Sequence, residues 1–116
     1  MMLIFAAPLK LTLVATGDKW LLVCWKQPLS GNALGYLVFI HSSVSTTTRN
    51  LSVTDLGIRN NLLCASVDNL QRWRNYSVQV AGWNNEEVGI RTIALPFNTN
   101  VNRELKINCN IKGKVI

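Results

Sequence analysis

The sequence predicts an all-β sandwich, in which seven antiparallel strands form two packed sheets. Hydrophobic residues recur at every second position, and turn-forming residues interrupt them at short intervals. No convincing amphipathic helix breaks this pattern. A chain of 116 residues with 48% hydrophobic and 16% charged side chains is long enough to bury one core of its own. We therefore expect one globular domain.

The first three strands are predicted at residues 9–15, 20–25 and 35–42. In the first, leucines alternate with other residues, and glycine and aspartate within residues 16–19 mark the turn that follows. The second strand ends before Pro28, which cannot donate to a central ladder. A loop then leads to the third strand, which begins at a glycine.

The remaining four strands are predicted at residues 43–53, 61–67, 76–83 and 88–95. The Ser- and Thr-rich composition of the first suits an edge strand, and a turn at residues 55–57 separates it from the second. Alternation predicts an inter-sheet core of fourteen residues: Leu11, Leu13, Leu21, Val23, Trp25, Tyr36, Val38, Ile40, Leu63, Val67, Leu70, Tyr76, Val78 and Val80.

The segment LQRWRNYSVQVAGWNNEEVG is the most specific in the chain. Leu70 precedes Tyr76 by six residues, and Tyr76 opens a strict alternation. This is the pattern of a tyrosine corner, in which the phenol hydroxyl bonds the backbone upstream and fixes a crossover between two sheets.

With LVCWKQP around Trp25 and GYLVFI around Tyr36, this segment closely resembles the fibronectin type III family over about residues 8 to 95. The resemblance implies an immunoglobulin-like β-sandwich in which Trp25, Tyr36, Leu70 and Tyr76 are structural residues. The corner variant with Trp73 looks like modules of neural adhesion receptors such as contactins, sidekicks and the Down syndrome cell adhesion molecule.

We divide the chain into an upstream segment, residues 1–7, the domain, residues 8–96, and a polar basic tail, residues 97–116. The tail shows no period, so we expect it to be disordered and dispensable. The apolar stretch at the start is too short for a membrane helix and lacks the basic region of a signal peptide. We expect a module of a longer secreted or surface protein.

No enzyme is indicated. The single histidine, His41, points outward on its strand without an orienting partner, the acidic residues are scattered among turns, and there is no phosphate-binding glycine loop. The three cysteines lack metal-binding spacing, so neither a metal nor a cofactor is expected. The net charge of +6 includes no five-residue basic run, which argues against nucleic-acid binding.

Two sequons, at Asn50 and Asn75, make glycosylation sites in a secreted chain. Asn50 falls on the exposed edge strand, whereas the tight corner beside Asn75 would hinder modification there.

Alternation places Leu37, Phe39, His41, Ala81 and Trp83 on the outer face of one sheet. Such a face is more apolar than a solvated sheet usually is. It is either a scatter of surface side chains or a docking surface for a neighbouring domain, and we weigh these alternatives evenly.

Cys24 and Cys64 are predicted to point outward from neighbouring strands of the other sheet. We expect two free thiols. A disulfide would need the two residues to form a directly opposed close pair.

The leading functional prediction is an extracellular protein-interaction and spacer module of a cell-adhesion or receptor protein. It would contact other protein domains and neighbouring modules, and reach a membrane only through its parent protein. The alternatives are an ectodomain module of a receptor enzyme, such as a receptor tyrosine phosphatase, and an intracellular cytoskeletal scaffold module.

Overall fold

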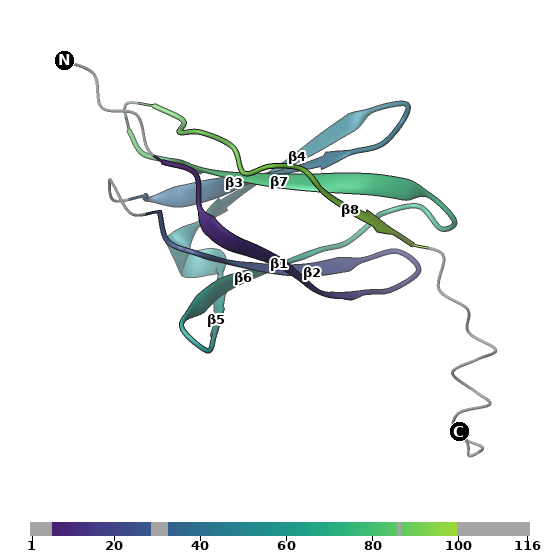
Figure 1. Ribbon diagram of the computed structural model, residues 1–116, viewed down its shortest axis with the longest axis horizontal. Coiled ribbons are helices and arrows are strands. Elements are labelled where there is room, and N and C mark those ends of the chain that lie inside the picture. Colours follow the sequence, from purple (N-terminus) through teal and green to yellow (C-terminus); the bar gives the residue numbers. More distant parts are fainter. Residues whose placement is uncertain (1–5, 29–32, 86, 100–116) are drawn as a thin grey trace.

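The computed structural model describes residues 6–28, 33–85 and 87–99, which form eight strands in two antiparallel sheets. In spatial order, the first sheet contains β1 (Leu9–Thr16), β2 (Leu21–Lys26), β6 (Leu62–Val67) and β5 (Gly57–Arg59). The second contains β4 (Thr46–Ser52), β3 (Gly35–His41), β7 (Asn75–Trp83) and β8 (Leu95–Asn98). A short 3₁₀ turn, η1 (Val53–Asp55), follows β4. Figure 1 shows the sheets stacked as two layers, which confirms the predicted sandwich.

The strand that the sequence pattern missed is β5, which begins at the last residue of the turn predicted at 55–57. Arg59 pairs with Leu62, so Asn60 and Asn61 form a two-residue hairpin turn between β5 and β6. Both asparagines have positive φ, 50° and 67°, as a type I′ turn requires. Asparagine tolerates this conformation better than most residues. The Asn-Asn pair was therefore the turn signal, and the strand predicted at 61–67 begins one residue later.

The last predicted strand, at residues 88–95, is wrong in position. Val88 makes only an isolated bridge with Trp83, and regular pairing with β7 resumes at Leu95. Between them, the Val80 N–H donates to the Thr92 hydroxyl at 3.0 Å, while the Thr92 N–H donates to the Val80 carbonyl at 2.9 Å. Because a side chain takes the place of one backbone acceptor, the ladder is interrupted there.

The predicted domain boundary at residue 96 is also wrong. Phe97 pairs with Tyr76 in the sheet, stacks on its ring at 5.3 Å and is 7% exposed. Thr99 is 1% exposed, and its hydroxyl bonds the Arg74 N–H and the Gln71 carbonyl. The domain therefore includes these residues, so the predicted tail up to Thr99 is part of the fold. Residues 1–5 and 100–116 of the predicted end segments lie outside the described residues.

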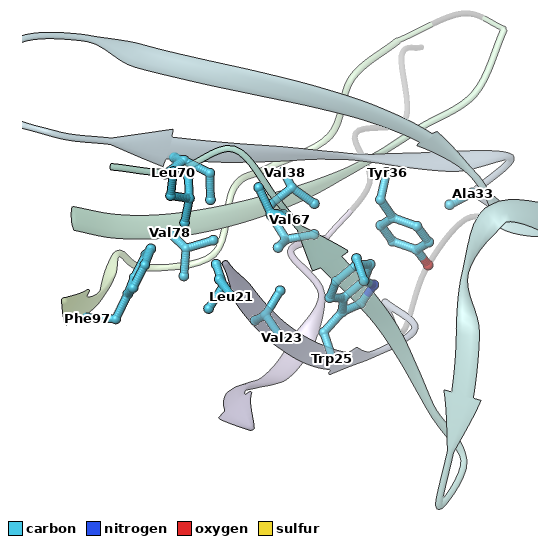
Figure 2. Packing of buried hydrophobic residues seen from close by; sticks show 13 residues of the cluster. Leu21, Val23, Trp25, Ala33, Tyr36, Val38, Val67, Leu70, Val78 and Phe97 are labelled. Atoms are coloured by element: carbon cyan, nitrogen blue, oxygen red, sulfur yellow. The ribbon is translucent and has the colours of Figure 1, made fainter. Parts of the chain in front are cut away.

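The core lies between the sheets, and all fourteen predicted core residues belong to it or pack against it. Trp25 and Tyr36 are fully buried and meet edge to face, with ring centroids 5.2 Å apart (Figure 2). Two alanines and Phe97 complete the buried cluster but were not predicted: Ala33, Ala65 and Phe97. Small side chains carry little hydrophobic signal, and Phe97 lay beyond the predicted boundary.

Cys24 and Cys64 form a disulfide, so the expectation of two free thiols is wrong. The two residues are directly opposed across β2 and β6, with Cα atoms 4.1 Å apart. This spacing is that of a close antiparallel pair. Thr12 and Gly57 flank the pair on the neighbouring strands, so the bridge lies in the middle of its sheet. A sequence alone does not fix the register to one residue, and register decides this bond.

Candidate functional site

The five residues predicted as an interaction face do share the outer face of the β4-β3-β7 sheet. Leu37 lies opposite Ala81, and Trp83 lies opposite Gly35, one step farther along the same face. Phe39 and His41 follow in the other direction and stack on each other, with ring centroids 6.4 Å apart.

The chain itself covers part of this face. Ala81 is 0% exposed and Phe39 is 7% exposed, and the Arg91 guanidinium lies 3.8 Å from the centroid of the Phe39 ring. A cation over an aromatic ring is a favourable contact. Of the apolar members of the face, Leu37 and Trp83 remain half-exposed, as does His41. The apolar surface is therefore smaller than alternation predicted.

His41 belongs to a hydrogen-bonded chain across the same face. Its Nδ1 lies 2.9 Å from the Thr46 hydroxyl, and its Nε2 lies 2.9 Å from Oε1 of Gln79. The Gln79 amide nitrogen donates to the Thr92 carbonyl at 2.9 Å. Since Oε1 of Gln79 must then accept, Nε2 of His41 donates the hydrogen bond to it. The histidine is outward-facing, as predicted, and it joins four chain segments rather than activating a nucleophile.

The Trp83 indole packs directly over the backbone of Gly35, which has no side chain. A Cβ atom at Gly35 would stand 2.3 Å from Cζ2 of the indole. Beside the indole is an open depression of about 360 Å³. Its wall is formed by Leu37, Asn50, Trp83, Asn84, Asn85, Glu87 and Val88. One of the two sequon asparagines thus faces the remaining apolar surface.

The second sequon asparagine, Asn75, is also exposed. It begins β7 and pairs with Asn98 of β8. It stands directly before the corner tyrosine, at the far end of β7 from the depression.

The tyrosine corner is confirmed. The Gln71 N–H donates to the Tyr76 hydroxyl at 2.8 Å, and the Leu70 N–H donates to the Lys19 carbonyl at 2.9 Å. The corner also presents Trp73, 67% exposed, with a positive φ of 57°. Bulky residues rarely adopt this conformation.

Trp73 was expected only as a variant of the corner motif, and no binding role was predicted for it. The available signal was an aromatic residue between two arginines, Arg72 and Arg74, at a turn.

The described part of the chain brings together no three His, Cys, Asp or Glu side chains that would hold a metal ion. None of its helices is long and apolar enough to cross a membrane.

Burial raises the pKa of the Tyr36 phenol, although the nearby Trp25 indole partly offsets this. Among residues 6–28, 33–85 and 87–99, neither that hydroxyl nor Nε1 of Trp25 has a partner in hydrogen-bonding geometry. The raised pKa of Tyr36 follows from its burial in the core.

No family model matches the chain. Over 119 aligned residues it is 32% identical to the protein sidekick homologue of Caenorhabditis elegans, and equally to that of Caenorhabditis briggsae. The alignments cover 96% of this chain but only 5% of each relative, so the chain spans about a twentieth of their length.

The fold is shared with solved structures, among them the following three. The FN5 domain of Drosophila Lar is 20% identical with a TM-score of 0.68, over 85% of this chain and all of that one. The chicken CNTN1 FN1–FN3 domains are 14% identical with a TM-score of 0.69, over 84% of this chain and 32% of that one. The fibronectin type III domain of a human protein is 20% identical with a TM-score of 0.63, over 85% and 89% of the two chains. The predicted fold and the predicted resemblance to sidekicks are confirmed.

Proposed function

Because the chain has the fibronectin type III fold and resembles one short segment of the sidekick homologues, we propose that it is an extracellular spacer and protein-interaction module of a longer adhesion or receptor protein. A module of this kind contributes no chemistry of its own. It holds its neighbours at a fixed separation and offers side chains to another protein surface.

The observation that carries the proposal is the disulfide between Cys24 and Cys64. Disulfides persist in oxidising compartments and are rare in the cytosol. The bond therefore favours the extracellular alternative over an intracellular scaffold.

The path of the chain supports the spacer role. It enters β1 at one end of the sandwich and leaves β8 at the opposite end, as Figure 1 shows. Modules joined in this way extend end to end.

Trp73 supports the interaction role. It is 67% exposed, and tryptophan and arginine are enriched among the residues that dominate binding energy. The backbone N–H of Trp73 donates to the Thr99 carbonyl at 3.5 Å. Trp73 therefore lies near the point where the chain leaves β8. Either a neighbouring module or a separate protein could contact the Trp73 indole at this position.

The proposal is tested by secreting the chain from mammalian cells behind an added leader and coating beads with the product. We expect a secreted protein with its disulfide formed, and beads that aggregate or attach to intact cells. Trp73→Ala should reduce attachment several-fold, because it removes the exposed indole.

Val44→Ala is the matched control, since Val44 is 74% exposed on a different turn. Retention of the chain inside the cell with reduced cysteines would contradict the extracellular assignment. If beads coated with the secreted protein attach no better than uncoated beads, the interaction role is contradicted and only the spacer role stands.

A further inference from the structure

We infer that Asn50 carries an N-linked glycan whose first N-acetylglucosamine lies in the depression beside it, against Leu37 and Trp83. The inference rests on the proposed function, because only a chain that passes through the secretory pathway is modified in this way. It goes further by assigning an occupant to the outer face of the β4-β3-β7 sheet.

The modification itself is a glycosyl transfer from a lipid-linked oligosaccharide diphosphate. The Asn50 amide nitrogen forms a bond to the anomeric carbon, and the bond from that carbon to the phosphate oxygen breaks. The lipid diphosphate leaves, and the amide releases one proton. The required acceptor sequence is Asn50-Leu51-Ser52.

The strand register directs the Asn50 side chain toward the depression. Asn50 is the cross-strand partner of Leu37, and Leu37 is the partner of Ala81. These three side chains form one row on the outer face, while Leu51 packs against the core. Asn50 is exposed on an edge strand, so the described residues leave its outer side open to an attached sugar.

The chemistry of the depression suits a sugar that lies flat. One pyranose face presents mainly C–H groups, which pack on apolar and aromatic surface, while the ring edge presents hydroxyl and acetamido groups. Here Leu37, Trp83 and Val88 supply apolar surface, and Asn84, Asn85 and Glu87 supply polar groups. A volume of about 360 Å³ lies at the small end of the ~300–1,000 Å³ typical of ligand sites.

Two features lower the cost of the contact. The indole is already fixed, because it occupies the space above Gly35. The sugar is tethered through Asn50, so its contact with the indole is an intramolecular event at high effective concentration. A free ligand would gain little binding free energy from so shallow a surface. A tethered sugar loses much less translational and rotational entropy when it makes the same contact.

The test uses the full chain secreted as the Asn75→Gln variant, which leaves one sequon. Endoglycosidase treatment trims the glycan to a single N-acetylglucosamine, and the Asn50→Gln/Asn75→Gln chain gives the unmodified reference. We expect the mass of one sugar on Asn50, and nuclear Overhauser contacts from its acetyl methyl group to the Trp83 ring and the Leu37 methyl groups. The Tm should exceed that of the unmodified chain by about 2–5 °C.

Leu37→Thr keeps a strand-forming residue but removes apolar surface, and should at least halve that difference in Tm. Val44→Thr is the matched control and should leave the difference unchanged, because Val44 lies away from the depression. An equal difference in all three chains, or no contacts to Trp83, would overturn the inference.

Failure of the inference is distinguishable from failure of the proposed function. A chain that is secreted with its disulfide formed but without a sugar on Asn50 overturns the inference alone. Self-association of the unmodified chain through Leu37 and Trp83 would likewise overturn it, since a second copy would then cover the depression.

Discussion

The Tyr76 hydroxyl accepts a hydrogen bond from the Gln71 backbone N–H at 2.8 Å, across the corner that joins the two sheets. Tyr76→Phe keeps the ring, its stacking on Phe97 and its burial, but removes the acceptor. Because Gln71 is exposed, water can reach the freed N–H. We therefore expect a loss of ~0.5–1.5 kcal/mol in the free energy of unfolding, measured by urea denaturation.

Tyr36→Phe is the matched control for that change. The Tyr36 hydroxyl is buried and has no hydrogen-bond partner within the described part of the chain, so its removal should leave stability unchanged or slightly raise it. Equal losses in the two variants would mean that the corner hydrogen bond contributes nothing specific.

Stability should fall at high pH because of Tyr36. Burial raises the pKa of its phenol above the ordinary value of 10.0, so the folded state holds the proton after the unfolded chain has lost it. The contribution is fully present below about pH 10 and is lost as pH rises toward the folded pKa. Urea unfolding between pH 8 and 11 should show a steeper decline above pH 10 for the natural chain than for Tyr36→Phe. Parallel curves would refute this.

Alkylation of the unreduced, unfolded protein should label Cys109 alone, because Cys24 and Cys64 are bonded. Replacing both bonded cysteines with alanine should cost ~3–4 kcal/mol, since the bridge closes a loop with a sequence separation of 40 residues. Cys109→Ala is the control and should retain the disulfide. Three labelled cysteines by mass spectrometry would count against the bond.

Thr99→Val should lower the Tm by several degrees. The change removes the hydroxyl that bonds Arg74 and Gln71, at a position that is 1% exposed, and so removes two partly buried hydrogen bonds at a cost of ~0.5–1.5 kcal/mol each. Thr99→Ser keeps the hydroxyl and should lose less, as judged by calorimetry. If valine is tolerated as well as serine, the hydroxyl does not anchor the end of β8.

Trp73→Gly should be more stable than Trp73→Ala by ~1–2 kcal/mol. Both variants remove the exposed indole, but only glycine adopts the positive φ of 57° without steric cost. Chemical denaturation of the two variants gives the difference directly. Equal stability would indicate that the corner relaxes to another backbone conformation when the indole is absent.

The core was predictable from sequence because its residues are large and alternate with period two. Trp25, Val38 and Val80 needed no information beyond their own strands. The disulfide and the interrupted pairing at Thr92 were not predictable in the same way. Each depends on how one strand is aligned with another, and a pattern within one strand carries no such information.

The candidate site shows the same division. Alternation correctly placed Leu37 and Trp83 on one outer face, but it did not reveal that Arg91 would lie over Phe39. That contact comes from an irregular segment after β7, whose path is set by hydrogen bonds to β7 rather than by hydrophobic period.

The response of the domain to a force applied at its two ends depends on where its covalent crosslink lies. The disulfide spans a sequence separation of 40 residues, from β2 to β6, and so encloses β3, β4 and β5. At ~3.3–3.6 Å per residue, about 130–145 Å of chain cannot be drawn out while the bond is intact. Pulled from its two ends, the oxidised module would yield only the segments outside the bridge, and a reductant would release the enclosed length. The redox state of the Cys24–Cys64 pair thus sets how far the domain can be extended by force.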